Sequence, residues 1–146
     1  KTLSEIQLAG ANHVVMEVSS HGLDQGRVNG VAFSVAVFSN MATDHLDYHG
    51  TLDNYAAAKK RLFFTPGLAA AVINLDDEFG RVLAKEVSDH VCVWGYSLEQ
   101  DVSKYKGCAD YFIHVKQITA FENGYHLSVK TPKGDADFDL PLLGRF

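Results

Sequence analysis

The sequence is poor in residues that cross-link or break a chain, with two cysteines and three prolines among 146 residues. Cys92 and Cys108 are too far apart for a Cys-x-x-Cys metal site and too few for a disulfide framework, so we expect two reduced thiols, at least one in a strand. No run reaches the ~18 consecutive apolar residues that cross a bilayer. The amphipathic opening segment carries an acidic residue and is unlike a secretory leader. We therefore expect no membrane insertion and a cytoplasmic location.

Positive charge is also scarce, because 13 lysines and arginines face 18 aspartates and glutamates, for a net charge of -5. Such a chain has no basic field to release counterions from a polynucleotide, so nucleic acid is not an expected partner. Apolar residues make up 47% of the chain, which is within the range of globular proteins. A chain of this length buries about 68–70% of the surface that its unfolded form exposes, enough for one core. We expect one domain or part of one.

Helical and extended patterns alternate over the first two thirds, which predicts a parallel sheet with covered faces. The extended runs are 14–18, 35–38, 70–73 and 91–94, and the helical patterns are 2–9, 52–64 and a segment from Asp76 or Asp77 to Val87. Thr51 is the expected N-cap of the second helix. The fold class is therefore α/β, with a doubly wound, mainly parallel sheet.

The pattern changes after residue 107, where short alternating segments are separated by glycine-containing turns. These segments are 112–115, 125–129 and 136–140, and they predict a small antiparallel meander at the C-terminal end. The stretch from Ser97 to Gly107 is expected to be an exposed connection.

Acidic and imidazole side chains are concentrated in the first third of the chain, at His13, Glu17, His21, Asp44, His45, Asp47 and His49. Glu17 interrupts the apolar run 14–18. A carboxylate there is costly unless it is paired with a cation or lies at the carboxyl end of the strand, where open α/β sheets bind ligands. The alternative is an edge strand with Glu17 facing water.

The sequence Asp44-His45-Leu46-Asp47 follows the expected strand 35–38 and therefore belongs to the same edge of the sheet. Carboxylates and neutral imidazoles are suitable ligands for a divalent ion such as Mg²⁺ that keeps waters and binds substrate phosphates. The alternative is structural: Asp44 or Asp47 caps a turn, and His45 is a hydrogen-bonded loop residue.

Lys59 follows three alanines on the expected helix 52–64. Small neighbours leave room for other groups to approach, and a lysine desolvated there is a reactive amine. The alternative is a surface lysine on an amphipathic helix, which describes Lys60 and Arg61 better.

Several ordered blocks resemble a known family: Met16–Leu23, Gln25–Val28, Phe38–Asn40, Asp44–Gly50 and Tyr55–Lys59. Together they resemble the central domain of the Mur ligases, most closely the MurE type. The resemblance is dense from 14 to 64, continues over 73–78 and returns at 143–146. Asp-His-Leu-Asp and the following Ala-Lys are shared with the wider ATP-dependent Mur and folylpolyglutamate ligase group, whereas Glu-Val-Ser-Ser-His points to the MurE type.

The resemblance implies an ATP-dependent carbon–nitrogen ligase of peptidoglycan precursor synthesis. Such an enzyme joins an amino acid, diaminopimelate or lysine, to UDP-MurNAc-L-Ala-D-Glu through an acyl phosphate. The alternatives are a folylpolyglutamate- or cyanophycin-type ligase, or a non-catalytic Mur-like binding domain. The joint presence of Glu17, His45 and Lys59 argues against the non-catalytic alternative, because losing one of them would suffice to inactivate the site.

The resemblance also implies roles for individual residues. Glu17 and His45 match ligands to Mg²⁺, and Lys59 matches a lysine that CO₂ converts into a carbamate able to help hold Mg²⁺. These three are the candidate catalytic residues, with Mg²⁺ as the expected cofactor and ATP as a substrate.

Other matched positions belong to the acceptor substrate and its surroundings. Ser19, Gln25 and Arg27 match residues that contact the UDP-muramoyl-peptide, and an arginine suits forked contact with carboxylate or phosphate oxygens. Asn40, Asp44 and His49 are the expected supporting residues. Asn74 and Asp76 resemble a recurring family segment, although a helix cap explains them equally well.

Residues 1–146 are expected to form part of a P-loop-type central domain, with an α/β part over 1–96 and antiparallel strands over 108–142. The sequence holds no Gly-Lys-Thr phosphate loop, and both ends of the chain are expected to be cut. The N-terminal UDP-binding domain and the C-terminal amino-acid-binding domain of the family are expected to lie outside these 146 residues. We therefore expect the 146-residue chain to be inactive alone.

Overall fold

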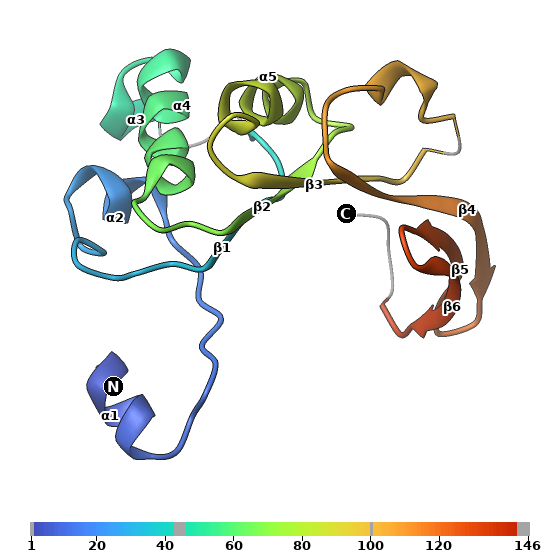
Figure 1. The fold of residues 1–146 in the computed structure, drawn as a ribbon, viewed down its shortest axis with the longest axis horizontal. Helices are drawn as coiled ribbons and strands as arrows, with labels where there is room; N and C mark the ends of the chain where they lie inside the picture. Colours follow the sequence, from blue (N-terminus) through green and yellow to red (C-terminus); the bar gives the residue numbers. More distant parts are fainter. Residues whose placement is uncertain (1, 43–45, 100, 143–146) are drawn as a thin grey trace.

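The computed structural model describes residues 2–42, 46–99 and 101–142 (Figure 1). Its helices are α1 (Leu3–Leu8), α2 (Ser20–Asp24), α3 (Leu46–His49), α4 (Leu52–Lys60) and α5 (Glu78–Val87), with 3₁₀ turns η1 (Arg61–Phe64) and η2 (Ser103–Tyr105). Its strands are β1 (Val35–Phe38), β2 (Ala70–Asn74), β3 (Cys92–Ser97), β4 (Tyr111–Phe121), β5 (Gly124–Thr131) and β6 (Gly134–Leu140). No helix in the described ranges is long and apolar enough to span a membrane.

The strands form one six-stranded sheet in the order β1-β2-β3-β4-β5-β6. The neighbours from β1 to β4 are parallel, and β4, β5 and β6 are antiparallel. This arrangement confirms the predicted α/β class, with a mainly parallel first part and an antiparallel meander at the C-terminal end.

Local sequence signals set where the helices begin. Thr51 caps α4 by accepting a hydrogen bond from the amide of Asn54, and Asp77 caps α5 by accepting one from the amide of Gly80. Both caps satisfy amides that have no partner inside the helix. The predicted cap at Thr51 is confirmed, and of the two alternatives for α5 the structure selects Asp77.

The main core lies between α5 and one face of the parallel strands. Phe38, Ile73 and Val93 alternate with less buried neighbours along their strands and pack with Leu83 and Val87 of the helix. The alternation follows from the strand geometry, because successive side chains point to opposite faces. Figure 1 shows α5 lying above β2 and β3 on this face.

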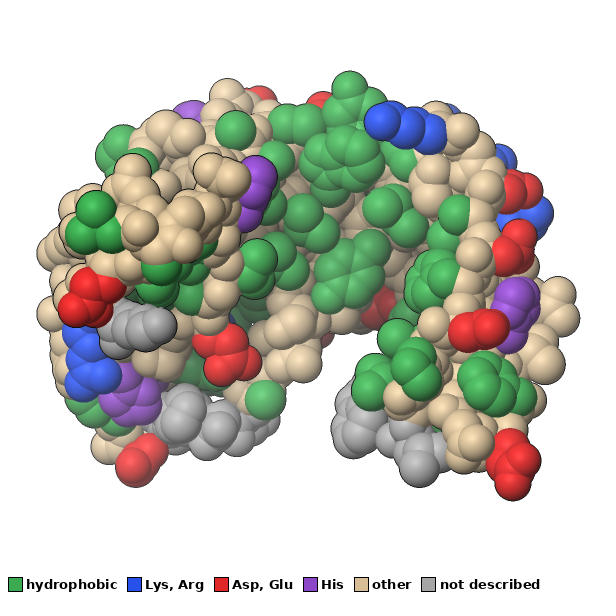
Figure 2. Space-filling model, turned by 90° about the horizontal axis from the view of Figure 1, so that it is seen from below, with side chains coloured by type: hydrophobic (Ala, Val, Ile, Leu, Met, Phe, Trp, Pro, Cys, Tyr) green, Lys and Arg blue, Asp and Glu red, His purple; other side chains and the backbone are tan. Residues whose placement is uncertain are grey.

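The opposite face of the parallel strands is apolar and partly open. Val37, Val72, Trp94 and Tyr111 lie in register across the four strands, and the rings of Trp94 and Tyr111 stack with centroids 4.5 Å apart. Val37 is 62% exposed and Tyr111 is 45% exposed. Figure 2 shows hydrophobic side chains gathered in a hollow on this side of the molecule. We call these four residues, together with Val35, the open sheet face.

The expected strand at 14–18 does not form. Residues 13–19 are extended without pairing to any described strand, and Val14, Val15 and Met16 remain 47%, 100% and 43% exposed. A β-forming sequence becomes a strand only when a neighbouring ladder accepts its hydrogen bonds. The prediction for this segment was therefore wrong for the chain as described.

The connection between β3 and β4 also differs from the expectation. It was predicted to be exposed, yet η2 buries Tyr105 and the following turn buries Cys108 against the main core. Both cysteines are free thiols, and Cys92 lies in β3 as expected.

Candidate functional site

Helices α2, α3 and α4 pack together at the β1 side of the sheet (Figure 1). Ser19 caps α2 by accepting a hydrogen bond of 3.0 Å from the amide of Gly22. At the next residue, the hydroxyl of Ser20 and Nε2 of His49 share a buried hydrogen bond of 3.0 Å. This bond ties the segment that follows Glu17 to the end of α3.

His49 lies at the centre of a group of rings. Its ring centroid is 5.4 Å from that of His21, 4.8 Å from that of Tyr48 and 5.4 Å from that of Tyr55. The His49 side chain is only 8% exposed, and its backbone carbonyl accepts a hydrogen bond from the Asn54 amide group of α4. The predicted supporting residue therefore links three helices through packing and hydrogen bonds.

Lys59 lies in the last turn of α4 and is half-buried. Its Nζ atom is 5.0 Å from the centroid of the Tyr55 ring, within the range of an attractive cation–π contact. Lys60 is half-buried as well and lies 5.8 Å from the centroid of the Phe64 ring, but it forms an ion pair with Glu86. Arg61 is exposed and forms an ion pair with Asp24.

The predicted substrate-binding residues flank α2: Ser19 caps its start, and Gln25 and Arg27 follow its end. Gln25 donates a hydrogen bond of 3.2 Å from Nε2 to the hydroxyl of Tyr48, which donates one of 3.1 Å to Asp24. Gln25 and Arg27 are exposed. Nothing in the local sequence pointed to Tyr48 as the partner of Gln25, because this contact joins residues that are 23 positions apart.

The remaining predicted residues are not brought together by the described structure. Asp44 and His45 lie outside the described residues. Glu17 is exposed on the extended segment 13–19, so in this chain it faces water, and Asn40 is exposed just beyond β1. Within the described ranges, no three acidic, histidine or cysteine side chains are grouped to hold a metal ion.

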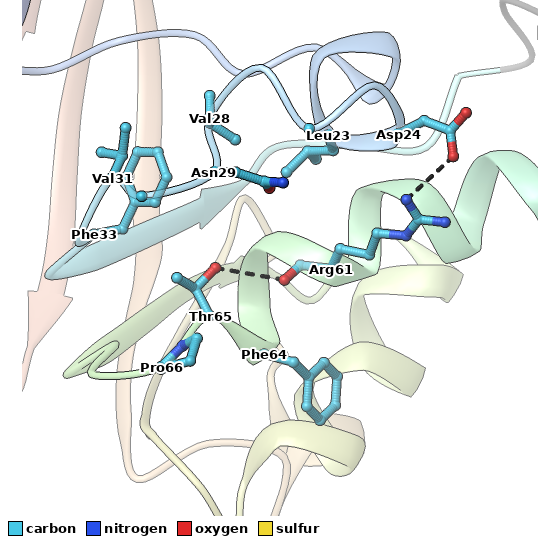
Figure 3. A pocket seen from close by; sticks show the side chains of 12 residues that line it. Leu23, Asp24, Val28, Asn29, Val31, Phe33, Arg61, Phe64, Thr65 and Pro66 are labelled. Atoms are coloured by element: carbon cyan, nitrogen blue, oxygen red, sulfur yellow. Dashed lines mark hydrogen bonds and ion pairs between the residues drawn. The ribbon is translucent and has the colours of Figure 1, made fainter.

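Two hollows flank the ion pair between Asp24 and Arg61, whose atoms are 3.1 Å apart. The first has a volume of about 370 Å³ and lies between the loop that follows α2 and the end of η1 (Figure 3). It contains none of the predicted side chains. The second has a volume of about 350 Å³, and Tyr48, His49 and Asn54 line it. The second hollow is therefore the one that belongs to the candidate site.

A separate cluster of polar side chains, centred on Asp76, lies just beyond the carboxyl end of β2. Asp76 accepts hydrogen bonds from the hydroxyls of Ser97 and Tyr105 and from the amide of Leu98. Burial alone would raise the pKa of Asp76, but these hydrogen bonds outweigh it and hold the pKa below its ordinary value. Burial, reinforced by the hydrogen bond to Asp76, raises the pKa of Tyr105.

Asp76 is therefore a structural anchor and not a helix cap. It connects the end of β2 to the end of β3 and to η2, which explains why Tyr105 is buried. The sequence contained a signal, the polar residues of Asn74-Leu75-Asp76-Asp77, but several partners of these side chains come from distant segments of the chain.

Comparison with known proteins agrees with this architecture. The family model described as the Mur ligase middle domain matches residues 1–146. The UDP-N-acetylmuramoyl-L-alanyl-D-glutamate--2,6-diaminopimelate ligase of Pseudomonas aeruginosa is 47% identical over 145 residues, which cover 99% of this chain and 28% of that protein.

Solved structures extend the comparison. A structure of a UDP-N-acetylmuramoyl-L-alanyl-D-glutamate--2,6-diaminopimelate ligase superposes with a TM-score of 0.81 at 38% identity, covering 94% of this chain and 27% of that one. An FPGS–AMPPCP complex matches with a TM-score of 0.56 at 18% identity, covering 80% of this chain and 26% of that one, which shows a shared fold alone. The chain thus spans little more than a quarter of the length of the proteins it matches.

The fold and the family match agree: a parallel sheet continues into an antiparallel meander, and the family model matches every residue of the chain. The chain therefore belongs to the Mur ligase family, as part of the middle domain.

Proposed function

We propose that this chain is the middle-domain part of a longer ATP-dependent ligase that joins 2,6-diaminopimelate to UDP-MurNAc-L-Ala-D-Glu. The observation that carries the proposal is the 47% identity over 99% of the chain to a ligase whose name states this reaction. The UDP-binding and amino-acid-binding domains would lie in the rest of that longer protein. A folylpolyglutamate- or cyanophycin-type activity has less support, because the FPGS structure shares only 18% identity.

In this proposal the γ-phosphoryl group of ATP is transferred to the carboxylate of the acceptor, which gives an acyl phosphate and releases ADP. The amine of diaminopimelate then attacks the acyl phosphate, and the tetrahedral intermediate collapses to an amide and phosphate. Little covalent chemistry is left to the protein, so its main tasks are to position the reactants and to offset negative charge. Ser19, Gln25 and Arg27 contact the acceptor, and the exposed positions of Gln25 and Arg27 leave them accessible to it.

Glu17, His45 and the carbamate of Lys59 are the proposed ligands of Mg²⁺, supported by the family resemblance and by their donor chemistry. Carboxylate and carbamate oxygens are the hard donors that Mg²⁺ prefers. When bound, Mg²⁺ offsets the charge of the phosphates. Asn40, Asp44 and His49 support the segment between β1 and α4, and the packing of His49 among three helices is consistent with this role.

Lys59→Ala in the longer ligase tests the proposal. We expect ADP release that depends on UDP-MurNAc-dipeptide and diaminopimelate to fall by about a hundredfold or more, because an anion that helps to offset phosphate charge is lost. Short carboxylates such as formate or acetate should restore part of the rate, since they can occupy the place of the carbamate.

Lys60→Ala is the matched control, because Lys60 is adjacent but pairs with Glu86 at the surface. Its rate should stay within about threefold of the wild type. Unchanged turnover in Lys59→Ala would remove Lys59 from the mechanism. A wild-type ligase that responds to another acceptor and not to UDP-MurNAc-dipeptide would overturn the proposed substrate.

A further inference from the structure

The carboxyl end of β2 connects to the end of β1 through two side chains that the proposed mechanism does not use. Asn74, the last residue of β2, donates a hydrogen bond of 2.8 Å from Nδ2 to the carbonyl of Ser39. Asp77 accepts a hydrogen bond of 2.8 Å at Oδ2 from the amide of Met41. The two hydrogen bonds lie on either side of Asn40, which is exposed and belongs to no helix or strand.

Both side chains are themselves fixed from the other end. Oδ1 of Asn74 accepts a hydrogen bond of 3.0 Å from the amide of Asp76, and Oδ1 of Asp77 accepts one of 3.0 Å from the amide of Gly80. Each side chain therefore uses one polar atom to hold its own turn and the other to hold the segment after β1. Hydrogen bonds to a carboxylate are stronger than those between neutral groups, which makes Asp77 the firmer anchor.

The position of the anchored segment gives the contacts a functional meaning. Residues 39–42 extend the carboxyl end of a parallel strand, where open α/β sheets bind their ligands. They also lead toward Asp44 and His45. A segment whose backbone does not pair with a neighbouring strand depends on hydrogen bonds from neighbouring side chains for a fixed geometry.

We propose that Asn74 and Asp77 are positioning residues that hold Asn40 and the segment after β1 in the geometry that the ligase reaction needs. The inference rests on the proposed function for its catalytic consequence, but the anchoring itself is independent of it. Asp77 acts through the amide of Met41, and Asn74 acts through the carbonyl of Ser39; neither residue is assigned a contact with substrate.

Asp77→Ser separates the two tasks of Asp77. Serine is as good an N-cap as aspartate, so the bond to the Gly80 amide is kept, but its single short hydroxyl cannot also reach the amide of Met41. In amide hydrogen exchange on the 146-residue chain, the Met41 amide should exchange about tenfold faster. The Gly80 amide should stay within about threefold of the wild type.

Asn74→Asp tests the second anchor in the same way. The carboxylate still accepts from the amide of Asp76, but it places an oxygen against the carbonyl of Ser39 and so replaces an attraction by a repulsion. Exchange of the Met41 amide and its neighbours should again accelerate, by about tenfold. Asp89→Ser, an exposed aspartate in the turn after α5, is the matched control and should change neither amide.

The catalytic consequence is measured in the longer ligase. Asp77→Ser should lower kcat by about tenfold or more while the KM for ATP stays within about twofold, because a displaced segment costs alignment and not ATP binding. The melting temperature should stay close to that of the wild type, which excludes general unfolding as the cause.

Two results would overturn the inference: unchanged exchange of the Met41 amide in Asp77→Ser, or faster exchange with an unchanged kcat. A wild-type ligase without diaminopimelate-dependent ADP release would instead contradict the proposed function. The exchange measurements on Met41 and Gly80 would then decide the anchoring on their own.

Discussion

Asp76 shows how one carboxylate can hold the ends of two parallel strands and the turn that follows them. Its two oxygens accept hydrogen bonds from the hydroxyls of Ser97 and Tyr105 and from the amide of Leu98. These donors lie at the end of β3 and in the segment that follows it. Each of these donors would lose this acceptor if the carboxylate were removed. The residue therefore contributes more to the folded state than an exposed aspartate does.

Asp76→Asn should destabilise the chain by about 1–3 kcal/mol at neutral pH, because charge-assisted hydrogen bonds are lost. The pKa of Asp76 is lowered in the folded state, so its contribution is present above the unfolded-state pKa and is lost as the pH falls. The difference in unfolding free energy between wild type and variant should therefore shrink between about pH 5 and about pH 3.

Urea unfolding at a series of pH values measures this difference. Asp89→Asn is the control, since Asp89 is exposed in the turn after α5 and should show no comparable loss. A gap between wild type and Asp76→Asn that stays constant down to pH 3 would show that the carboxylate charge is not what holds Ser97, Leu98 and Tyr105.

Sequence reasoning at the level of single residues succeeded where the signal was local. Thr51 and the pair Asp76/Asp77 were identified as cap candidates because a capping residue and its helix are adjacent in the chain. The partners of Asp76 and His49 were not foreseen, because they come from distant segments. The roles of Glu17, His45 and Lys59 stay predictions that the resemblance supports.

At the scale of elements, the contact of α5 with β2 depends on Gly80. A Cβ atom at this position would overlap the carbonyl oxygen of Asn74 and press on the ring of Phe38. At an exposed position inside a helix, replacing glycine by alanine stabilises the helix by about 1 kcal/mol. Here the helix would have to move away from the end of β2.

Gly80→Ala should therefore destabilise the chain, by about 1–3 kcal/mol, in spite of the better helix propensity of alanine. Thermal unfolding followed by circular dichroism measures the loss. Lys85→Ala, on the exposed side of the same helix, should remain within about 0.5 kcal/mol of the wild type. A stabilised Gly80→Ala variant would mean that α5 is not packed as closely as described.

Elements were predicted well where a segment's pattern and its neighbours agreed. The run 35–38 is a strand with those bounds, and the helix that ends at Val87 begins after Asp77. The run 14–18 has an equally strong β pattern but no ladder partner among the described strands, so its propensity alone does not make it a strand. Tertiary pairing decided this case.

At the scale of the whole molecule, the open sheet face is the most unusual surface. A contiguous apolar surface of this kind is uncommon on a soluble monomer and binds apolar probes or other proteins. The 146-residue chain should therefore increase the fluorescence of the dye ANS. Val37→Lys, at the β1 end of the row that runs to Tyr111, should reduce this signal and any self-association.

Val82→Lys is the control for this prediction, because Val82 on α5 is 50% exposed but lies away from the open sheet face. Its dye signal should match that of the wild type. Equal signals from the wild type and Val37→Lys would show that the open sheet face does not bind the dye.

The 146-residue chain alone should bind ATP and Mg²⁺ at most weakly and should not catalyse the ligase reaction. Its sequence lacks the Gly-Lys-Thr loop whose amides and lysine hold phosphates in P-loop proteins. Isothermal titration calorimetry of the 146-residue chain should give no saturable heat with ATP and Mg²⁺. Turnover by the chain in isolation would contradict this prediction.

The long strand β4 has a consequence for how the molecule comes apart. Its residues Tyr111–His114 pair with β3, its residues His114–Phe121 pair with β5, and the two ladders overlap at His114. The strands on either side rest on separate apolar clusters. Loosening of β5 and β6 therefore need not disturb β1, β2 and β3, so β4 marks a boundary between two cooperative unfolding units.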